Sequence, residues 1–308
     1  MSRPLLIDAD PGCDDAVAIA MAAGDESLDI VGMSTVHGNG TVEDTTRNAL
    51  AICDEVGLDD VPVAKGCDRP LRVELETGEA IHGEGGLKGE VSPPTRDPVD
   101  LHAAAFIVEM AREYPGELVL APLGPLTNVA VALALEPELP DLIDETVVMG
   151  GAAYTAGNVT PLAEANIYHD PEAADRVVAD LSPSLVGLDV TVEATIDPDR
   201  RSKLPETPLR PLLQTWLDYY PDWLIERYDI EATLMHDAVV IATLVDDEVV
   251  RFEESPLSVL TGDGPHRGKV VPDPYESGEF DGDGRVAVDI DPDRFNELLF
   301  ERLATLPL

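Results

Sequence analysis

Basic residues are scarce in this chain, which has 20 lysines and arginines against 61 aspartates and glutamates and a formal net charge of −41. Only four of the bases are lysines. Because such a surface repels a phosphate backbone, we expect no nucleic-acid partner. We interpret the acidity as a halophilic adaptation, since concentrated salt screens the repulsion between carboxylates.

Cysteine and long apolar runs are also scarce. Cys13, Cys53 and Cys67 form no C-x-x-C pair, which argues against a disulfide framework or a zinc site and favours small buried thiols. No apolar run approaches the ~20 residues that a membrane-spanning helix needs, so we expect no membrane partner. The first ten residues do not resemble a signal peptide, and we expect a cytoplasmic protein.

The chain does contain a regular alternation of short apolar strands and amphipathic helices, with 44% hydrophobic residues. In the first half, the pattern predicts strands at 4–9, 29–36, 61–64, 117–121 and 146–149 and helices at 14–23, 42–56, 99–114 and 126–135. In the second half, it predicts helices at 171–179, 209–228, 236–244 and 291–303 and strands at 184–188, 249–250, 258–260 and 286–290. This order predicts an α/β fold with a mostly parallel central sheet flanked by helices, a Rossmann-like core. We find no linker and expect a single domain over residues 1–308, with one long Gly/Pro-rich loop at 65–98 that we expect to be functional.

Ligands bind beyond the carboxyl ends of the strands in such sheets. Polar side chains follow the predicted strands at these ends, namely Asp8, Asp10, Asp14, Asp15, His37, Asn39, Asn128, Asn158, Glu164 and Asn166. The segment from Asp8 to Asp15 is the densest, with four carboxylates around the turn Pro11-Gly12. In a dry pocket these acids need a cation, and an all-oxygen set suits Ca²⁺ or Mg²⁺. They could instead form a solvated loop that caps the following helix.

Two later segments extend the pattern. His236-Asp237 begins an apolar helix and could bring one more carboxylate to the same place, although a structural histidine or a helix cap explains it equally simply. Asn158, Glu164 and Asn166 offer the acceptors and amides that a sugar diol needs, although an ordinary polar loop has the same composition.

Taken together, these motifs resemble the nucleoside hydrolase family, the inosine–uridine-preferring group. Residues 8–16 match its D-x-D-P-G-x-D-D-A signature, and residues 123–128 match its L-G-P-L-T-N segment. Residues 157–166 match its sugar-binding loop, and His236-Asp237 matches its late His-Asp pair. The four motifs occur in the family's order, so the resemblance spans nearly the whole chain.

The resemblance implies Ca²⁺-dependent hydrolysis of ribonucleosides by a homodimer or homotetramer. It assigns the Ca²⁺ ligands to Asp10, Asp15, Asp237 and the carbonyl of Leu123. It assigns ribose binding to Asp14, Asn39, Asn158, Glu164 and Asn166. Asp10 would be the general base and His236 a candidate acid for the leaving base.

The base-binding side is less defined. His82 could contact the base or be structural, Tyr228 could line the pocket, and Trp223 could stack on the base but is more typical of a core residue. Two other functions stay open. A Mg²⁺-dependent HAD-like phosphatase also uses an Asp-x-Asp strand end, but no lysine or arginine accompanies residues 8–15. A non-catalytic nucleoside- or sugar-binding protein would return its ligand unchanged.

Overall fold

A long parallel sheet runs through the computed structural model, which describes residues 2–89, 91–218, 232–273, 275, 277–278 and 282–306. Within these residues the sheet has eight strands in the order β3-β2-β1-β4-β5-β6-β12-β9. Their bounds are β1 Arg3–Ala9, β2 Leu28–Thr35, β3 Val63–Lys65, β4 Leu118–Pro122, β5 Ile143–Met149, β6 Ser184–Val186, β9 Val250–Glu254 and β12 Arg285–Ile290. Neighbouring strands are parallel except β12 and β9 at one edge. The predicted α/β class is confirmed.

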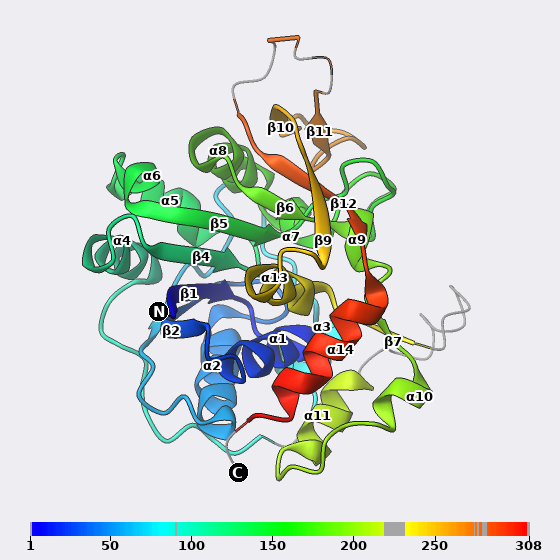
Figure 1. Ribbon diagram of the computed structural model, residues 1–308. Coiled ribbons are helices and arrows are strands. Elements are labelled where there is room, and N and C mark those ends of the chain that lie inside the picture. Colours follow the sequence, from blue (N-terminus) through cyan, green and yellow to red (C-terminus); the bar gives the residue numbers. More distant parts are fainter. Residues whose placement is uncertain are drawn as a thin grey trace.

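Helices cover both faces of the sheet (Figure 1). One face carries α1 Cys13–Ala23, α2 Val42–Val56, α11 Arg210–Leu217, α13 His236–Val245 and α14 Pro292–Leu303. The other carries α4 Ala103–Glu113, α5 Thr127–Leu135 and α8 Pro171–Leu181, with the short α6 Leu139–Leu142 beside them. Because both faces are buried, the central strand β1 reads as the continuous apolar run Leu5-Leu6-Ile7, each residue fully buried.

Helix α1 lies deep in the molecule rather than on its surface. Its residues from Cys13 to Ala22 are all buried, and α11, α13 and α14 pack around it. A helix that is apolar on every side has this kind of position in the core of a large domain.

Several short elements escaped the sequence pattern. They are α3 Glu79–His82, a 3₁₀ turn η1 Glu84–Gly86, α7 Ala165–His169, α9 Leu188–Thr191, α10 Pro198–Arg201, and the strands β7 Thr195–Ile196, β8 Thr233–Leu234 and β11 Val270–Pro272. The predicted loop at 65–98 therefore contains two helical turns. The strand predicted at 258–260 is observed as β10 Leu257–Val259. Strands β7 and β8 pair with each other, as do β10 and β11, outside the main sheet.

Two predicted helices have different bounds. The helix expected from residue 99 begins at Ala103, because the His102 side chain accepts a hydrogen bond from the Ala104 amide (3.2 Å) while Val99 pairs with the edge strand β3. The segment expected over 209–228 is described only to Asp218, so the predictions for Trp223 and Tyr228 lie outside the described residues. None of the described helices is both long and apolar enough to cross a bilayer.

Candidate active site

A cavity of about 250 Å³ opens at the carboxyl ends of the central strands. Eight predicted site residues line it, namely Asp14, Asn39, His82, Asn158, Glu164, Asn166, His236 and Asp237. Within the described residues, the cavity lining does not include Asp10, Asp15 or Leu123. Each of them interacts with a residue that does line it: Asp10 interacts electrostatically with Asp14, Asp15 accepts a hydrogen bond from Asn39, and the Leu123 carbonyl accepts one from Asn166. A shallower hollow of about 680 Å³ lies beside Arg285. We assign the site to the smaller cavity, because buried carboxylates and imidazoles converge on it.

The turn from Asp10 to Asp15 has a glycine at its centre because neighbouring side chains approach it closely. Gly12 precedes the first turn of α1, and its amide donates to Asp15 Oδ2 at 2.9 Å. A Cβ atom at this position would lie 2.5 Å from His82 Nδ1. The turn therefore lets α3 pack directly against it, while Asp14 lines the cavity.

Three carboxylates converge beside the cavity. Asp14, Asp15 and Asp237 each offer one oxygen, and these oxygens all lie within 4.8 Å of one another. Their residues are only 6%, 1% and 4% exposed. Burial first, and then the neighbouring carboxylates, raises the pKa of Asp10 and of Asp237 well above the ordinary range. Burial also raises the pKa of Asp14 and of Asp15. All these groups cannot be ionised together without a positive charge among them.

The cluster fits a divalent cation. The Oδ1 atoms of Asp14 and Asp15 are buried and have no hydrogen-bond partner among the described residues. Buried carboxylate oxygens without donors are unusual, and a hard cation satisfies them while it offsets their repulsion. The ligands on offer are all oxygens, which favours Ca²⁺ or Mg²⁺ over zinc or copper.

Asn39 ties the end of β2 to this turn. Its amide N–H donates to Asp10 Oδ2 at 2.7 Å, and its Nδ2 donates to the Asp10 carbonyl at 3.1 Å and to Asp15 Oδ2 at 3.2 Å. Asp10 is thus held from outside the turn, and Cβ atoms at Gly38 or Gly124 would collide with it. Deeper in the sheet, Asn128 Nδ2 donates to Asp8 Oδ1 at 2.8 Å.

Another part of the cavity lining comes from the residue before the short helix α7 and from α7 itself. Glu164 caps it, accepting hydrogen bonds from the amides of Asn166 (2.8 Å) and Ile167 (3.2 Å), and from Gly151 N at 2.9 Å. Asn166 Nδ2 donates to the Leu123 carbonyl at 2.6 Å. This bond places the predicted carbonyl ligand next to the predicted sugar-binding amide. Burial raises the pKa of Glu164, against the pull of its backbone donors.

Two of the cavity's imidazoles lie near the acidic turn. Burial lowers the pKa of His82 to about 3 and that of His236 to about 4, so both rings are neutral at pH 7. His82 Nδ1 lies 3.9 Å from Asp14 Oδ1 and accepts a long bond (3.4 Å) from Cys13 N. His236 Nδ1 lies 2.8 Å from Thr191 Oγ1.

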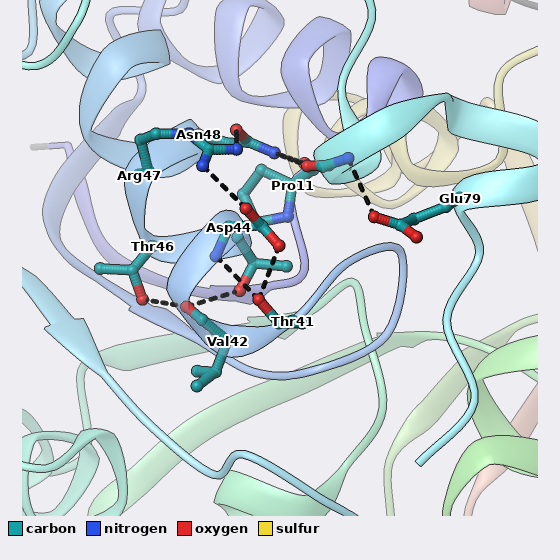
Figure 2. A network of polar contacts seen from close by, with 10 residues as sticks. Pro11, Thr41, Val42, Asp44, Thr46, Arg47, Asn48 and Glu79 are labelled. Atoms are coloured by element: carbon teal, nitrogen blue, oxygen red, sulfur yellow. Dashed lines mark hydrogen bonds and ion pairs between the residues drawn. The ribbon is translucent and has the colours of Figure 1, made fainter.

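A polar network outside the cavity fixes α3 to the acidic turn (Figure 2). The buried side chain of Asn48, in α2, donates to the carbonyls of Pro11 (3.0 Å) and Gly85 (2.8 Å), and Gly85 N donates to Glu79 Oε1 at 3.0 Å. Thr41 caps α2 through the amide of Asp44. The two loops that shape the site are therefore clamped by one asparagine.

The sequence patterns missed several lining residues. His169 is the main one, since it ends α7 and faces the cavity, and Glu76, Thr77 and Met149 also line it. His169 ends a helix of five residues that has no clear periodicity, and only its spacing of three from Asn166 could have indicated it.

The sequence matches the family model described as inosine-uridine preferring nucleoside hydrolase over residues 5–297. The chain belongs to the nucleoside hydrolase family. It is therefore an enzyme that acts on N-glycosyl bonds, in a family whose members depend on a metal ion. The acidic signature at 8–16, which the match includes, supplies Asp14 and Asp15 of the carboxylate cluster described above, and the match also includes Asp237.

Relatives of this nucleoside hydrolase carry different base preferences. The chain is 39% identical over 309 residues to the pyrimidine-specific ribonucleoside hydrolase RihA of Photobacterium profundum, covering 99% of both chains. It is 38% identical to uridine nucleosidase 1 of Arabidopsis thaliana, covering 83% of this chain and 78% of that one. Its fold matches a plant nucleoside hydrolase, PpNRh1, and a purine-preferring ribonucleoside hydrolase from Gardnerella vaginalis. Each match has a TM-score of 0.92, 31% identity and 99% coverage of both chains.

Proposed function

We propose that this enzyme hydrolyses ribonucleosides to a free base and ribose with the help of Ca²⁺, and that uridine is its first substrate to test. The observation that carries the proposal is the convergence of Asp14, Asp15 and Asp237 beside one cavity, which Glu164 and Asn166 also line. The choice of uridine rests on the pyrimidine and uridine names of relatives at 38–39% identity.

Asp10, Asp15, Asp237 and the Leu123 carbonyl would hold the Ca²⁺ ion, and Asp14 lies close enough to join them. When bound, the ion offsets the repulsion between these carboxylates, holds vicinal sugar hydroxyls and lowers the pKa of adjacent water. Ca²⁺ is favoured over Mg²⁺ because it accepts six to eight oxygens in flexible geometry, whereas Mg²⁺ keeps several of its waters.

Side chains of the protein carry out the proton transfer, the charge stabilisation and the binding of the sugar. Asp10, fixed by the amide of Asn39, takes a proton from the attacking water at its carboxylate, which contributes roughly 10²–10⁴-fold in rate. The buried acids stabilise the positive charge that develops on the sugar ring as the bond breaks. Direct attack by water inverts the anomeric centre. Ribose is held by Asp14, Asn39, Asn158, Glu164 and Asn166.

His236 assists the leaving base. In this role its neutral ring accepts a hydrogen bond from the Thr191 hydroxyl at Nδ1, which leaves Nε2–H to donate toward the departing base. His82 and Tyr228 complete the base side. Trp223 is the further candidate there.

The test is the release of ribose from a panel of ribonucleosides with and without EDTA. Asp10→Ala should abolish turnover with the fold intact, and persistent activity would remove Asp10 from the role of base. His236→Ala should harm uridine more than a nitrophenyl riboside, which has an activated leaving group. Equal losses on both would count against donation by His236. Release of phosphate from a phosphate ester would favour the phosphatase, and binding of unchanged nucleoside would favour the non-catalytic protein.

The proposal also covers the location of the protein, its assembly and the salt concentration at which it works. We propose a cytoplasmic, single-domain subunit that forms a homodimer or homotetramer and works at high salt. The support for salt adaptation is the net charge of −41, which dense counterions would screen. Light scattering in concentrated KCl tests the assembly, and a monomer in all conditions would contradict it.

A further inference from the structure

The loop between β5 and α7, residues 150–163, reaches the cavity without containing a helix or a strand. We call it the cavity loop, because Asn158 and Val159 line the cavity. Its outer part folds back on itself, since Val159 N donates to the Ala163 carbonyl at 3.3 Å. Such a bond fixes the shape of the outer part. Its place relative to the cavity depends on what holds the two ends of the loop.

Three consecutive residues contact both ends of the cavity loop. Gly268, Lys269 and Val270 form the end of the link from β10 and the start of β11, and we call them the brace. A Cβ atom on Gly268 would lie 3.1 Å from Ala163 Cβ, and a Cβ atom on Gly151 would lie 2.9 Å from Val270 Cγ2. All three brace residues are described, and none of them lines the cavity.

Lys269 makes polar contacts between the brace and the first end of the loop. Its Nζ donates to the carbonyls of Ala152 and Ala153, the latter at 2.9 Å. Asp189, at the start of α9, holds the amides of the same segment, accepting from Ala153 N at 2.8 Å and from Tyr154 N at 2.6 Å. Both alanines are buried, and hydrogen bonds from charged groups are roughly twice as strong as neutral ones. The backbone of the loop is therefore held by a cation and an anion together.

The brace is attached to the body of the protein. Leu260 N donates to the Lys269 carbonyl at 2.9 Å, which joins the two sides of the link between β10 and β11. Figure 1 shows β10 next to α8 at the top of the view, and the two elements are in contact. Arg267, in the same link, forms an ion pair with Glu172 of α8 at 2.5 Å. Lys269 thus projects from a fixed support.

We propose that Lys269 is a positioning residue for the reaction, and that the brace holds the cavity loop in its binding position from outside the cavity. This inference rests on the proposed function. A loop that is already in place loses little freedom when substrate binds, so the apparent affinity depends on the fraction of enzyme with the loop in place. If the loop contacts the bound substrate and the transition state equally, its release raises KM and changes kcat little.

The kinetic experiment compares the wild-type enzyme with Lys269→Met, which keeps an unbranched side chain and removes the ammonium group. We expect KM for uridine, or for the best ribonucleoside of the panel, to rise about tenfold, with kcat within about threefold. Lys269→Arg retains a cation with donors and should recover most of the affinity. Lys269→Gln retains a neutral donor on a shorter side chain and should lie between wild type and Lys269→Met.

Arg267→Met is the matched control. It removes a cation from the same link, but its partners in the described part of the chain, Glu172 and Thr261, lie outside the cavity loop. This variant can lose stability, and its KM should stay within about twofold of wild type. If KM in Lys269→Met rises no more than in Arg267→Met, the inference is overturned.

Limited proteolysis with chymotrypsin tests the brace without using activity. The Tyr154 residue is 53% exposed, but its backbone belongs to the segment that Lys269 and Asp189 hold, so cleavage after it requires the loop to open. Mass spectrometry of the fragments should show about tenfold faster cleavage after Tyr154 in Lys269→Met. Cleavage after Tyr275, which is 91% exposed and outside the loop, should stay unchanged. Faster cleavage after both tyrosines would mean general unfolding, and Lys269→Gln would then carry both tests.

The outcomes separate the two levels of the proposal. If the wild-type enzyme releases no ribose from any ribonucleoside, the proposed function is wrong, and the cleavage rates after Tyr154 still test whether the brace holds the loop. If the wild-type enzyme cleaves ribonucleosides and Lys269→Met cleaves after Tyr154 no faster, only the inference is wrong. Faster cleavage with an unchanged KM would give Lys269 a purely structural role and would also overturn the inference.

Discussion

Asp15→Asn should make the metal-free enzyme more stable while it weakens the metal-bound enzyme. The side-chain oxygen of asparagine can still accept the hydrogen bonds that Asp15 Oδ2 receives from Gly12 and Asn39. Its amide would replace Oδ1, which has no donor within the described part of the chain and faces the other acids. The change removes one charge from a buried cluster and adds a donor.

The magnitude follows from the spacing of the carboxylates. At the 4.8 Å limit that joins Asp14, Asp15 and Asp237, two full charges repel by about 3 kcal/mol at an effective dielectric constant of 20. The protein can avoid this repulsion by protonating one acid, which costs about 4 kcal/mol at pH 7 for a group with an ordinary pKa. The smaller of these two free energies is the amount by which the cluster destabilises the metal-free wild-type enzyme. We therefore expect Asp15→Asn to raise the free energy of unfolding in EDTA by about 2–4 kcal/mol and Tm by about 3–6 °C.

The assay is thermal unfolding at pH 7 in EDTA and again in excess Ca²⁺. A matched control is Asp25→Asn, since Asp25 is also a buried aspartate but pairs with Arg302 and accepts from Ser27. The control should lose stability in both buffers, whereas Asp15→Asn should gain it in EDTA and show a much smaller Ca²⁺ shift than wild type. If Asp15→Asn loses stability in EDTA as the control does, the reasoning about a repulsive cluster is refuted.

Three further predictions concern other parts of the molecule. Asn48→Ala leaves the buried carbonyls of Pro11 and Gly85 without their donor, so denaturant titration should show a loss of about 2–4 kcal/mol, and a loss below about 0.5 kcal/mol would contradict the clamp. Burial would raise the pKa of Asp25, but Ser27 and Arg302 outweigh it and hold that pKa below its ordinary value. This pair therefore stabilises the fold above about pH 4 and ceases to do so as pH falls through the lowered pKa, so the stability gap between wild type and Asp25→Asn should close toward pH 3. A gap that widens with acid would contradict this sign. Finally, Tm should rise steadily from dilute to concentrated KCl because counterions screen a net charge of −41, and a flat response would argue against salt adaptation.

The parallel sheet could be predicted because each of its central strands has a distinctive apolar sequence. Leu5-Leu6-Ile7 and Val147-Val148 are buried on both faces, and each is followed by a polar ligand segment. The short helices α3 and α7 could not be predicted in the same way. Four or five residues give no period, and their caps, Gly78 and Glu164, are set by contacts with distant segments.

The acidic residues of the site could be predicted from the sequence, whereas the residues that hold them in place could not. Asp14, Asp15 and Asp237 come together although 222 residues separate Asp15 from Asp237 (237 − 15), and the family's motif order indicated the pairing. The Asn48 clamp and the hydrogen bonds from His37 through Thr127 to Asp170 depend on loop geometry. Residues of this kind are ordinary polar positions in a sequence, and only the fold shows which buried atoms they satisfy.

The all-round burial of α1 has a consequence for how the protein is made. Every site residue predicted from the sequence lies at or before Asp237, yet α1 is covered in part by α14, which Arg302 ties to Asp25. The ribosome therefore completes the predicted site residues 66 residues before it reaches the end of α14, which covers that core (303 − 237 = 66). Until then the apolar flank of α1 is exposed, and we expect nascent or truncated chains to engage chaperones rather than act as smaller enzymes.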